Sequence, residues 1–124
     1  MSLTLQELFG TNATYSAGNL SFNVDDLVDK NGNSLLDSTT LDSENAAEKI
    51  MVALLIHQSN TAKPVRDENS VDITPSDRGI VYEDQTFSVG RTFVTREEVN
   101  QIEHTITVKV YTSDNTGLQA NDVV

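Results

Sequence analysis

The chain contains no cysteine and no tryptophan among its 124 residues. The absence of cysteine excludes disulfides, thiolate metal sites and cysteine nucleophiles. Aromatic residues make up only 6% of the chain, which gives little support to a platform that stacks bases or sugar rings. Basic residues are also scarce, since 8 Lys and Arg oppose 19 Asp and Glu for a net charge of −11. Such a surface repels phosphate groups, so neither nucleic acid nor a membrane surface is expected as a partner.

Long hydrophobic runs are missing as well. The longest, Ile50 to Ile56, is far shorter than the roughly 20 apolar residues that span a membrane. The first ten residues show neither a basic segment nor a long apolar one, so no secretory signal is predicted and a cytoplasmic location is expected. The length favours a single domain over residues 1–124, with a polar loop near 61–75 and a loose C-terminal tail near 113–124.

The apolar run lies inside a predicted helix over Ala46–Gln58. Ser43 is placed to cap its first turn, and Pro64 and the polar residues before it predict an end near Asn60. Apolar residues recur at helical spacing and also widen the stripe beyond one face. We therefore expect a central buried helix that is covered on most sides, with Leu54 and Leu55 in the core.

Shorter elements surround this helix in the sequence. A capping-box pattern from Thr4 to Glu7, followed by Gly10, predicts a short N-terminal helical turn. Alternating residues predict a hairpin over 13–24 with one buried face, and three later runs, 80–82, 86–95 and 102–112, predict an antiparallel meander. The predicted fold class is α+β, with the central buried helix packed on an antiparallel sheet of hairpin and meander strands.

One segment, residues 29–37, suggests metal chemistry. Oxygen-bearing side chains stand at alternate positions 29, 31 and 33, where they can converge on a hard cation. The segment resembles the first half of an EF-hand loop. The resemblance implies a calcium site, and its candidate ligands are Asp29, Asn31, Asn33 and Asp37.

The same segment has a second interpretation that needs no ion. Asn31-Gly32 is a strong signal for a tight turn. Ser34 replaces the glycine of an EF-hand loop at its sixth position, and Thr40 replaces the bidentate glutamate at its twelfth. We therefore expect the turn, with no cofactor, and keep a weak calcium module as the alternative.

Catalytic motifs are absent from the sequence. Its two histidines, His57 and His104, stand in no metal or nucleophile signature, and no phosphate-binding glycine pattern occurs. The leading hypothesis is a non-enzymatic structural or protein-interaction module that binds a protein partner or itself. We expect self-association, most simply as a dimer, through the region from Thr86 to Thr112, because its long strands lack proline and leave an open edge. A small enzyme or ligand carrier, with a pocket near either histidine, is a further alternative.

Overall fold

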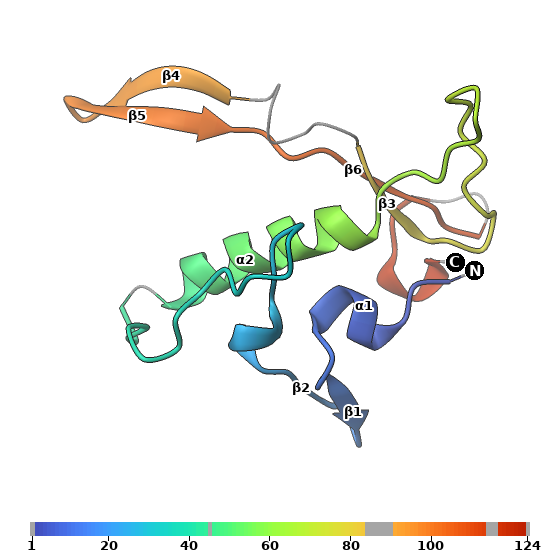
Figure 1. Ribbon diagram of the computed structural model, residues 1–124, viewed down its shortest axis with the longest axis horizontal. Coiled ribbons are helices and arrows are strands. Elements are labelled where there is room, and N and C mark those ends of the chain that lie inside the picture. The colour runs from blue at the N-terminus through green and yellow to red at the C-terminus, as the bar shows by residue number, and fades with distance from the viewer. Residues whose placement is uncertain (1, 45, 84–90, 114–116, 124) are drawn as a thin grey trace. The chain divides into compact units, whose positions relative to one another are not determined.

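The computed structural model describes residues 2–44, 46–83, 91–113 and 117–123. Its contacts divide the chain into two compact units, residues 1–62 and 63–124. Both α-helices lie in the first unit, whereas strands occur in both (Figure 1). One main helix, a short N-terminal helix and antiparallel strand pairs are all present, so the predicted α+β class is confirmed. The organisation as one domain stays a prediction.

The N-terminal helix α1 spans Leu5–Phe9. The Thr4 hydroxyl accepts a hydrogen bond from the Glu7 amide at 3.1 Å, as the capping pattern predicts. Gly10 follows the helix with φ of 103°, a conformation that only glycine adopts easily. A Cβ atom at Gly10 would lie 2.5 Å from Cβ of Asp26, so the chain approaches too closely here for any side chain.

A short hairpin follows α1. Strands β1, Thr14–Ser16, and β2, Asn19–Ser21, pair antiparallel, and their turn places Ala17 and Gly18 at positive φ. The hairpin is confirmed, but the predicted buried face is wrong, because all six strand residues are exposed. Each strand is only three residues long, and the apolar residues that pack lie just outside the hairpin. Ala13, before β1, is buried, and the ring centroid of Phe22, after β2, lies 5.6 Å from that of Phe9.

The main helix, α2, spans Ala46–Thr61, close to the predicted bounds. The segment before it is held by Asp42, whose carboxylate accepts the Glu44 amide at 2.9 Å, in place of the predicted Ser43 cap. Its buried residues are Ala53, His57 and Ser59, whereas Leu54 and Leu55 are half-buried. Met51 and Val52 are 57% and 50% exposed, so the helix is covered on a narrower face than the sequence indicates.

The core of the first unit gathers small side chains around one large one. A 3₁₀ turn, η1, spans Val24–Asp26, and Leu27 directly after it is 0% exposed and is the largest fully buried side chain of the described residues. Ala53 and Ala62 of the α2 region are buried with it. Of the apolar run of α2, only Ala53 is fully buried, and Leu54, Leu55 and Ile56 are half-buried.

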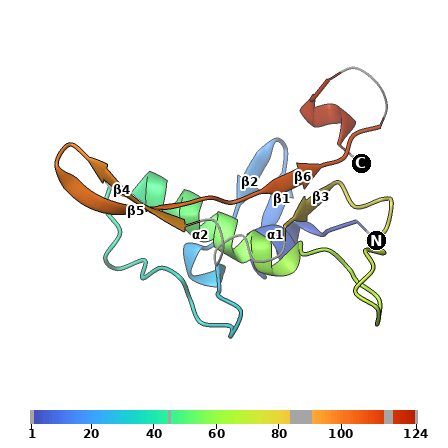
Figure 2. The same ribbon diagram turned by 90° about the horizontal axis from the view of Figure 1, so that it is seen from above.

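The second unit is built from two strand pairs. Strand β3, Ile80–Tyr82, pairs antiparallel with β6, Val108–Val110, and β4, Arg91–Arg96, pairs antiparallel with β5, Val99–His104 (Figure 2). Among the described residues β3 pairs with β6, which belongs to the third predicted run, and not with β4. Residues 86–90 of the predicted second run lie outside the described residues.

The C-terminal end of this unit is held by backbone pairing. A 3₁₀ turn, η2, spans Ala120–Asp122, and Val123 forms a bridge with Thr112. The Ser113 amide donates to the Asp122 carbonyl at 2.7 Å. Among residues 117–123, Asp122 and Val123 thus find backbone partners just after β6, while the loose tail near 113–124 stays a prediction.

Candidate functional site

The β4–β5 hairpin is the candidate interaction surface. Its six cross-strand pairs run from Arg91 opposite His104 to Arg96 opposite Val99, and the two-residue turn consists of Glu97 and Glu98. Both turn residues have positive φ, 50° and 65°, as a type I′ turn requires. Glutamate is unusual at these positions, where Asn and Gly are preferred.

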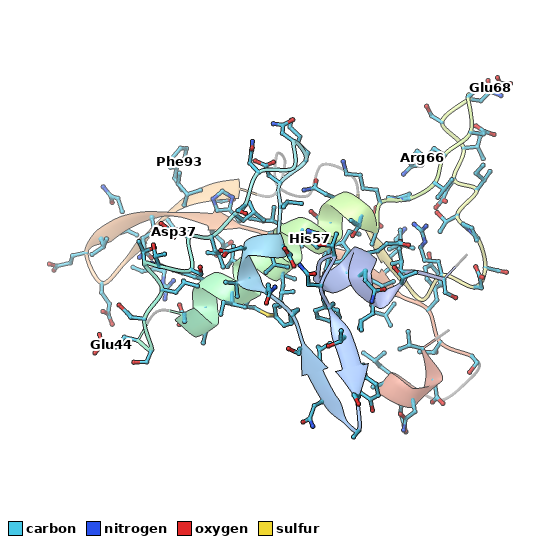
Figure 3. All side chains as sticks on the ribbon, turned by 60° about the horizontal axis from the view of Figure 1, so that its bottom comes forward. Asp37, Glu44, His57, Arg66, Glu68 and Phe93 are labelled. Carbon is cyan, nitrogen blue, oxygen red and sulfur yellow. The ribbon has the colours of Figure 1, made fainter. Side chains whose placement is uncertain are left out.

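The hairpin buries almost none of its own side chains. Every residue of β5 is exposed, and on β4 only Val94 is half-buried between residues 92 and 96. Phe93 is 79% exposed and stands out from β4 (Figure 3). Because side chains alternate along a strand, Phe93 and its cross-strand partner Ile102 share one face, and Val94 and Val99 lie on the other. Both faces of the hairpin thus present apolar surface.

Between residues 92 and 104, the described side chains make few polar contacts across the strands. The Thr95 hydroxyl donates to Oδ1 of Asn100 across the strands at 3.1 Å. In the other strand pair of this unit, Lys109 Nζ lies 2.7 Å from Oε1 of Glu83, and this ion pair raises the pKa of the exposed Lys109 ammonium. The hairpin itself is therefore held mainly by its backbone ladder.

The candidate calcium loop closes on its own backbone. Oδ1 of Asp29 accepts the amides of Asn31 at 2.8 Å and Asn33 at 3.0 Å. The Gly32 amide donates to the Asp29 carbonyl at 3.0 Å, with Gly32 at φ of 82°. The bonds from the Asn33 and Asn31 amides to the carboxylate, with the Asn33 bond contributing most, hold the pKa of the Asp29 carboxyl below its usual range. The turn at Asn31-Gly32 is confirmed.

Asp37, the fourth candidate ligand, belongs to a separate turn. Its Oδ1 accepts the Thr39 hydroxyl at 2.6 Å and the Thr39 amide at 3.0 Å, and these bonds lower the pKa of the Asp37 carboxyl. Within the described ranges no three His, Cys, Asp or Glu side chains come together to hold a metal ion. Asn31 and Asn33 fall outside that set of residue types, so weak calcium binding by the 29–37 loop stays a prediction.

The Asp29 turn has a counterpart in the second unit. Oδ1 of Asp67 accepts the amides of Asn69 at 2.8 Å and Val71 at 3.0 Å. The Ser70 amide donates to the Asp67 carbonyl at 3.0 Å, and Ser70 has positive φ, as Gly32 does in the first turn. The same hydrogen-bond pattern therefore occurs twice, and both turns begin with the sequence Asp-x-Asn.

His57 joins three segments of the first unit. The Val28 amide donates to Nδ1 at 3.2 Å, and Nε2 lies 3.0 Å from the Glu7 carbonyl oxygen. Since a carbonyl only accepts, Nε2 carries the proton and Nδ1 is the acceptor. The ring is 6% exposed and both nitrogens are occupied, so His57 is a structural residue that joins α2 to α1 and to the segment after η1.

Several open, ligand-sized hollows lie on the surface of the described residues. The one beside His57, about 450 Å³, is lined by Gln6, Asp25, Ser34 and neighbouring polar residues. A more apolar groove of about 360 Å³ lies along α2 and is lined by Leu35, Leu36, Val52 and Ile56 among others. His104, the other histidine, is exposed on β5. His57 shares its hollow with Asp25, and His104 lies opposite Arg91 in the β4–β5 ladder.

Comparisons with protein-family models, with curated proteins and with solved structures find no match for this chain. Across the part of the chain that the structure describes, none of the helices has the length and apolar character needed to cross a membrane.

Proposed function

We propose that the chain is a protein-interaction module that self-associates through the β4–β5 hairpin, most simply as a twofold dimer. The observation that carries the proposal is the exposure of apolar residues on both faces of a two-stranded hairpin, with Phe93 79% exposed at its centre. An isolated two-stranded hairpin is marginally stable in water, and a third strand or a covering layer stabilises it. Exposed apolar surface of this kind marks interaction sites.

The electrostatic setting defines the conditions for association. The net charge of −11 opposes the approach of two copies at low salt. At about 0.15 M salt the Debye length is about 8 Å, so repulsion between distant charges is damped and contacts at the hairpin decide the equilibrium. Association should accordingly strengthen between low and physiological ionic strength.

Sedimentation equilibrium over a hundredfold range of concentration at physiological salt tests the proposal. We expect a dimer mass at the upper end, and for Phe93→Ser an increase in the dissociation constant of about tenfold or more, as for other central aromatic contacts. Leu118→Ser is the matched control, because Leu118 is 74% exposed and lies in the same unit outside the hairpin. A monomer mass at every concentration, or equal effects of the two substitutions, would refute the proposal.

A further inference from the structure

The outer edge of β5 has a defined set of backbone groups available for pairing. In a two-residue hairpin the pair next to the turn, Arg96 and Val99, exchanges both of its hydrogen bonds, and bonded pairs alternate along the ladder. The amides and carbonyls of Asn100, Ile102 and His104 therefore point away from β4. Within the described ranges no strand pairs with this edge.

The side chains of these same three residues share a face with Phe93. Phe93 and Thr95 oppose Ile102 and Asn100 in the ladder, and residues directly opposite point to the same side of a sheet. His104 stands two positions after Ile102 and therefore lies on that side too. The backbone amide and carbonyl of Ile102 thus point away from β4, and its side chain belongs to the apolar pair Phe93–Ile102. A strand added at this edge would extend that apolar row.

We propose that β5 pairs antiparallel with β5 of a second copy of this chain, about a twofold axis that passes through Ile102. The inference rests on the proposed self-association and names its edge and register. Ile102 then lies opposite Ile102 of the second copy, Gln101 opposite Glu103, and Asn100 opposite His104. Twofold contacts of this kind use the same patch on both copies.

Side-chain chemistry selects this register. A twofold axis perpendicular to the sheet pairs residues of the same face, so only registers centred on one residue are allowed. With Ile102 at the centre, the Gln101 amide donates to the Glu103 carboxylate of the second copy, and the Asn100 amide group faces the His104 ring. Centring on Gln101 places Val99 opposite Glu103 and Ile102 opposite Asn100. Centring on Glu103 places two carboxylates opposite each other, which is destabilising.

The β4 edge is the less suitable one. Its sequence carries Arg91 and Arg96, and basic residues on an edge strand are a common protection against pairing. Centring on Phe93 would set Thr92 opposite Val94, a polar group against an apolar one. Glu103 is the only acidic residue of β5, and in the proposed register the Gln101 amide of the second copy lies opposite it as a hydrogen-bond donor.

The product is a four-stranded antiparallel sheet in the order β4, β5, β5, β4. One of its faces carries a continuous apolar row of Phe93, Ile102, Ile102 and Phe93. Three or more strands with an apolar face are what an antiparallel sheet needs for stability, so pairing supplies what a single hairpin lacks.

Cysteine crosslinking tests the register directly, because the chain contains no cysteine. In the proposed sheet the two Ile102 Cα atoms lie about 5.5 Å apart, within the range that a disulfide spans. The two Phe93 residues lie three strand spacings apart, about 14 Å, beyond that range. We expect Ile102→Cys to give a disulfide-linked dimer as the main product of mild oxidation, and Phe93→Cys, the matched control, to stay unlinked.

Amide exchange on the wild-type protein gives a second readout that changes no side chain. Raising the concentration until about nine-tenths of the chain is associated should slow exchange at Asn100, Ile102 and His104 about tenfold, and leave Phe93 and Thr95 unchanged. Crosslinking through Phe93→Cys, or equally through both variants, overturns the register. A wild-type dimer with no slowing at β5 overturns the edge but keeps the proposed function, and a wild-type monomer overturns both.

Discussion

Replacing His57 with leucine should destabilise the first unit by removing two hydrogen bonds while keeping a side chain of similar size. The Val28 amide and the Glu7 carbonyl would lose their partners, which lie 3.2 and 3.0 Å from the ring nitrogens. A polar group left unsatisfied in the interior costs about 1–3 kcal/mol. Both groups are part-buried, so we expect a loss of about 2–4 kcal/mol in the free energy of unfolding.

Urea denaturation followed by helical ellipticity is the appropriate assay, because α1 and α2 both belong to the first unit. His104→Leu is the matched control: the chain's other histidine is exposed, and its replacement should change stability by no more than about 0.5 kcal/mol. Nitrogen chemical shifts of the wild-type ring should show the proton on Nε2 of His57. A loss below about 1 kcal/mol for His57→Leu, or a proton on Nδ1, would refute the assignment of this ring as a structural bridge.

Three further predictions follow from the turns and loops. Gly10→Ala should destabilise the first unit by more than about 2 kcal/mol, because the new Cβ would meet Cβ of Asp26 at 2.5 Å. Gly18→Ala, which shares a positive φ but has open space, should cost only about 1 kcal/mol, and equal losses in denaturation would contradict the steric argument. Millimolar calcium should not raise the melting temperature, since Asp29 is engaged with its own turn; a stabilisation of several degrees abolished by Asp29→Ala would contradict this. Carboxyl titration by NMR should place the pKa values of Asp29 and Asp37 below their usual range. The stability that these carboxylates contribute is then fully present above the unfolded-state pKa, and it is lost as the pH falls through the lowered values.

Local signals in the sequence predicted the local elements well. The capping residue Thr4, the glycine after α1 and the turn at Asn31-Gly32 all act within a few residues, so their side chains and backbone preferences determine the outcome. The bounds of α2 followed from a helical apolar pattern and from the polar segment before Pro64. These features depend little on the rest of the chain.

Long-range pairing and burial were harder to predict. The apolar stripe of α2 does not reveal that His57 is more buried than Met51, because burial depends on which segments reach each side of the helix. Strand β3 pairs with β6 across the whole β4–β5 hairpin, a choice that periodicity within each strand cannot encode. For the candidate site, the sequence predicted the region with an open β edge. It did not predict that Phe93 is the most exposed apolar residue of that region, or that Glu97 and Glu98 form a tight turn.

The two similar turns at Asp29 and Asp67 also affect the order in which the chain can fold. Each closes within five residues, at Asp29–Asn33 and Asp67–Val71, and each is flanked by an isolated bridge, Val28 to Ser34 and Arg66 to Asp72. Closing a loop of this size takes well under a microsecond, whereas pairing β3 with β6 must first bring together segments separated by the whole β4–β5 hairpin. The two turns can therefore form early in each half of the chain, and substituting either aspartate should slow refolding only if its turn is already present in the transition state.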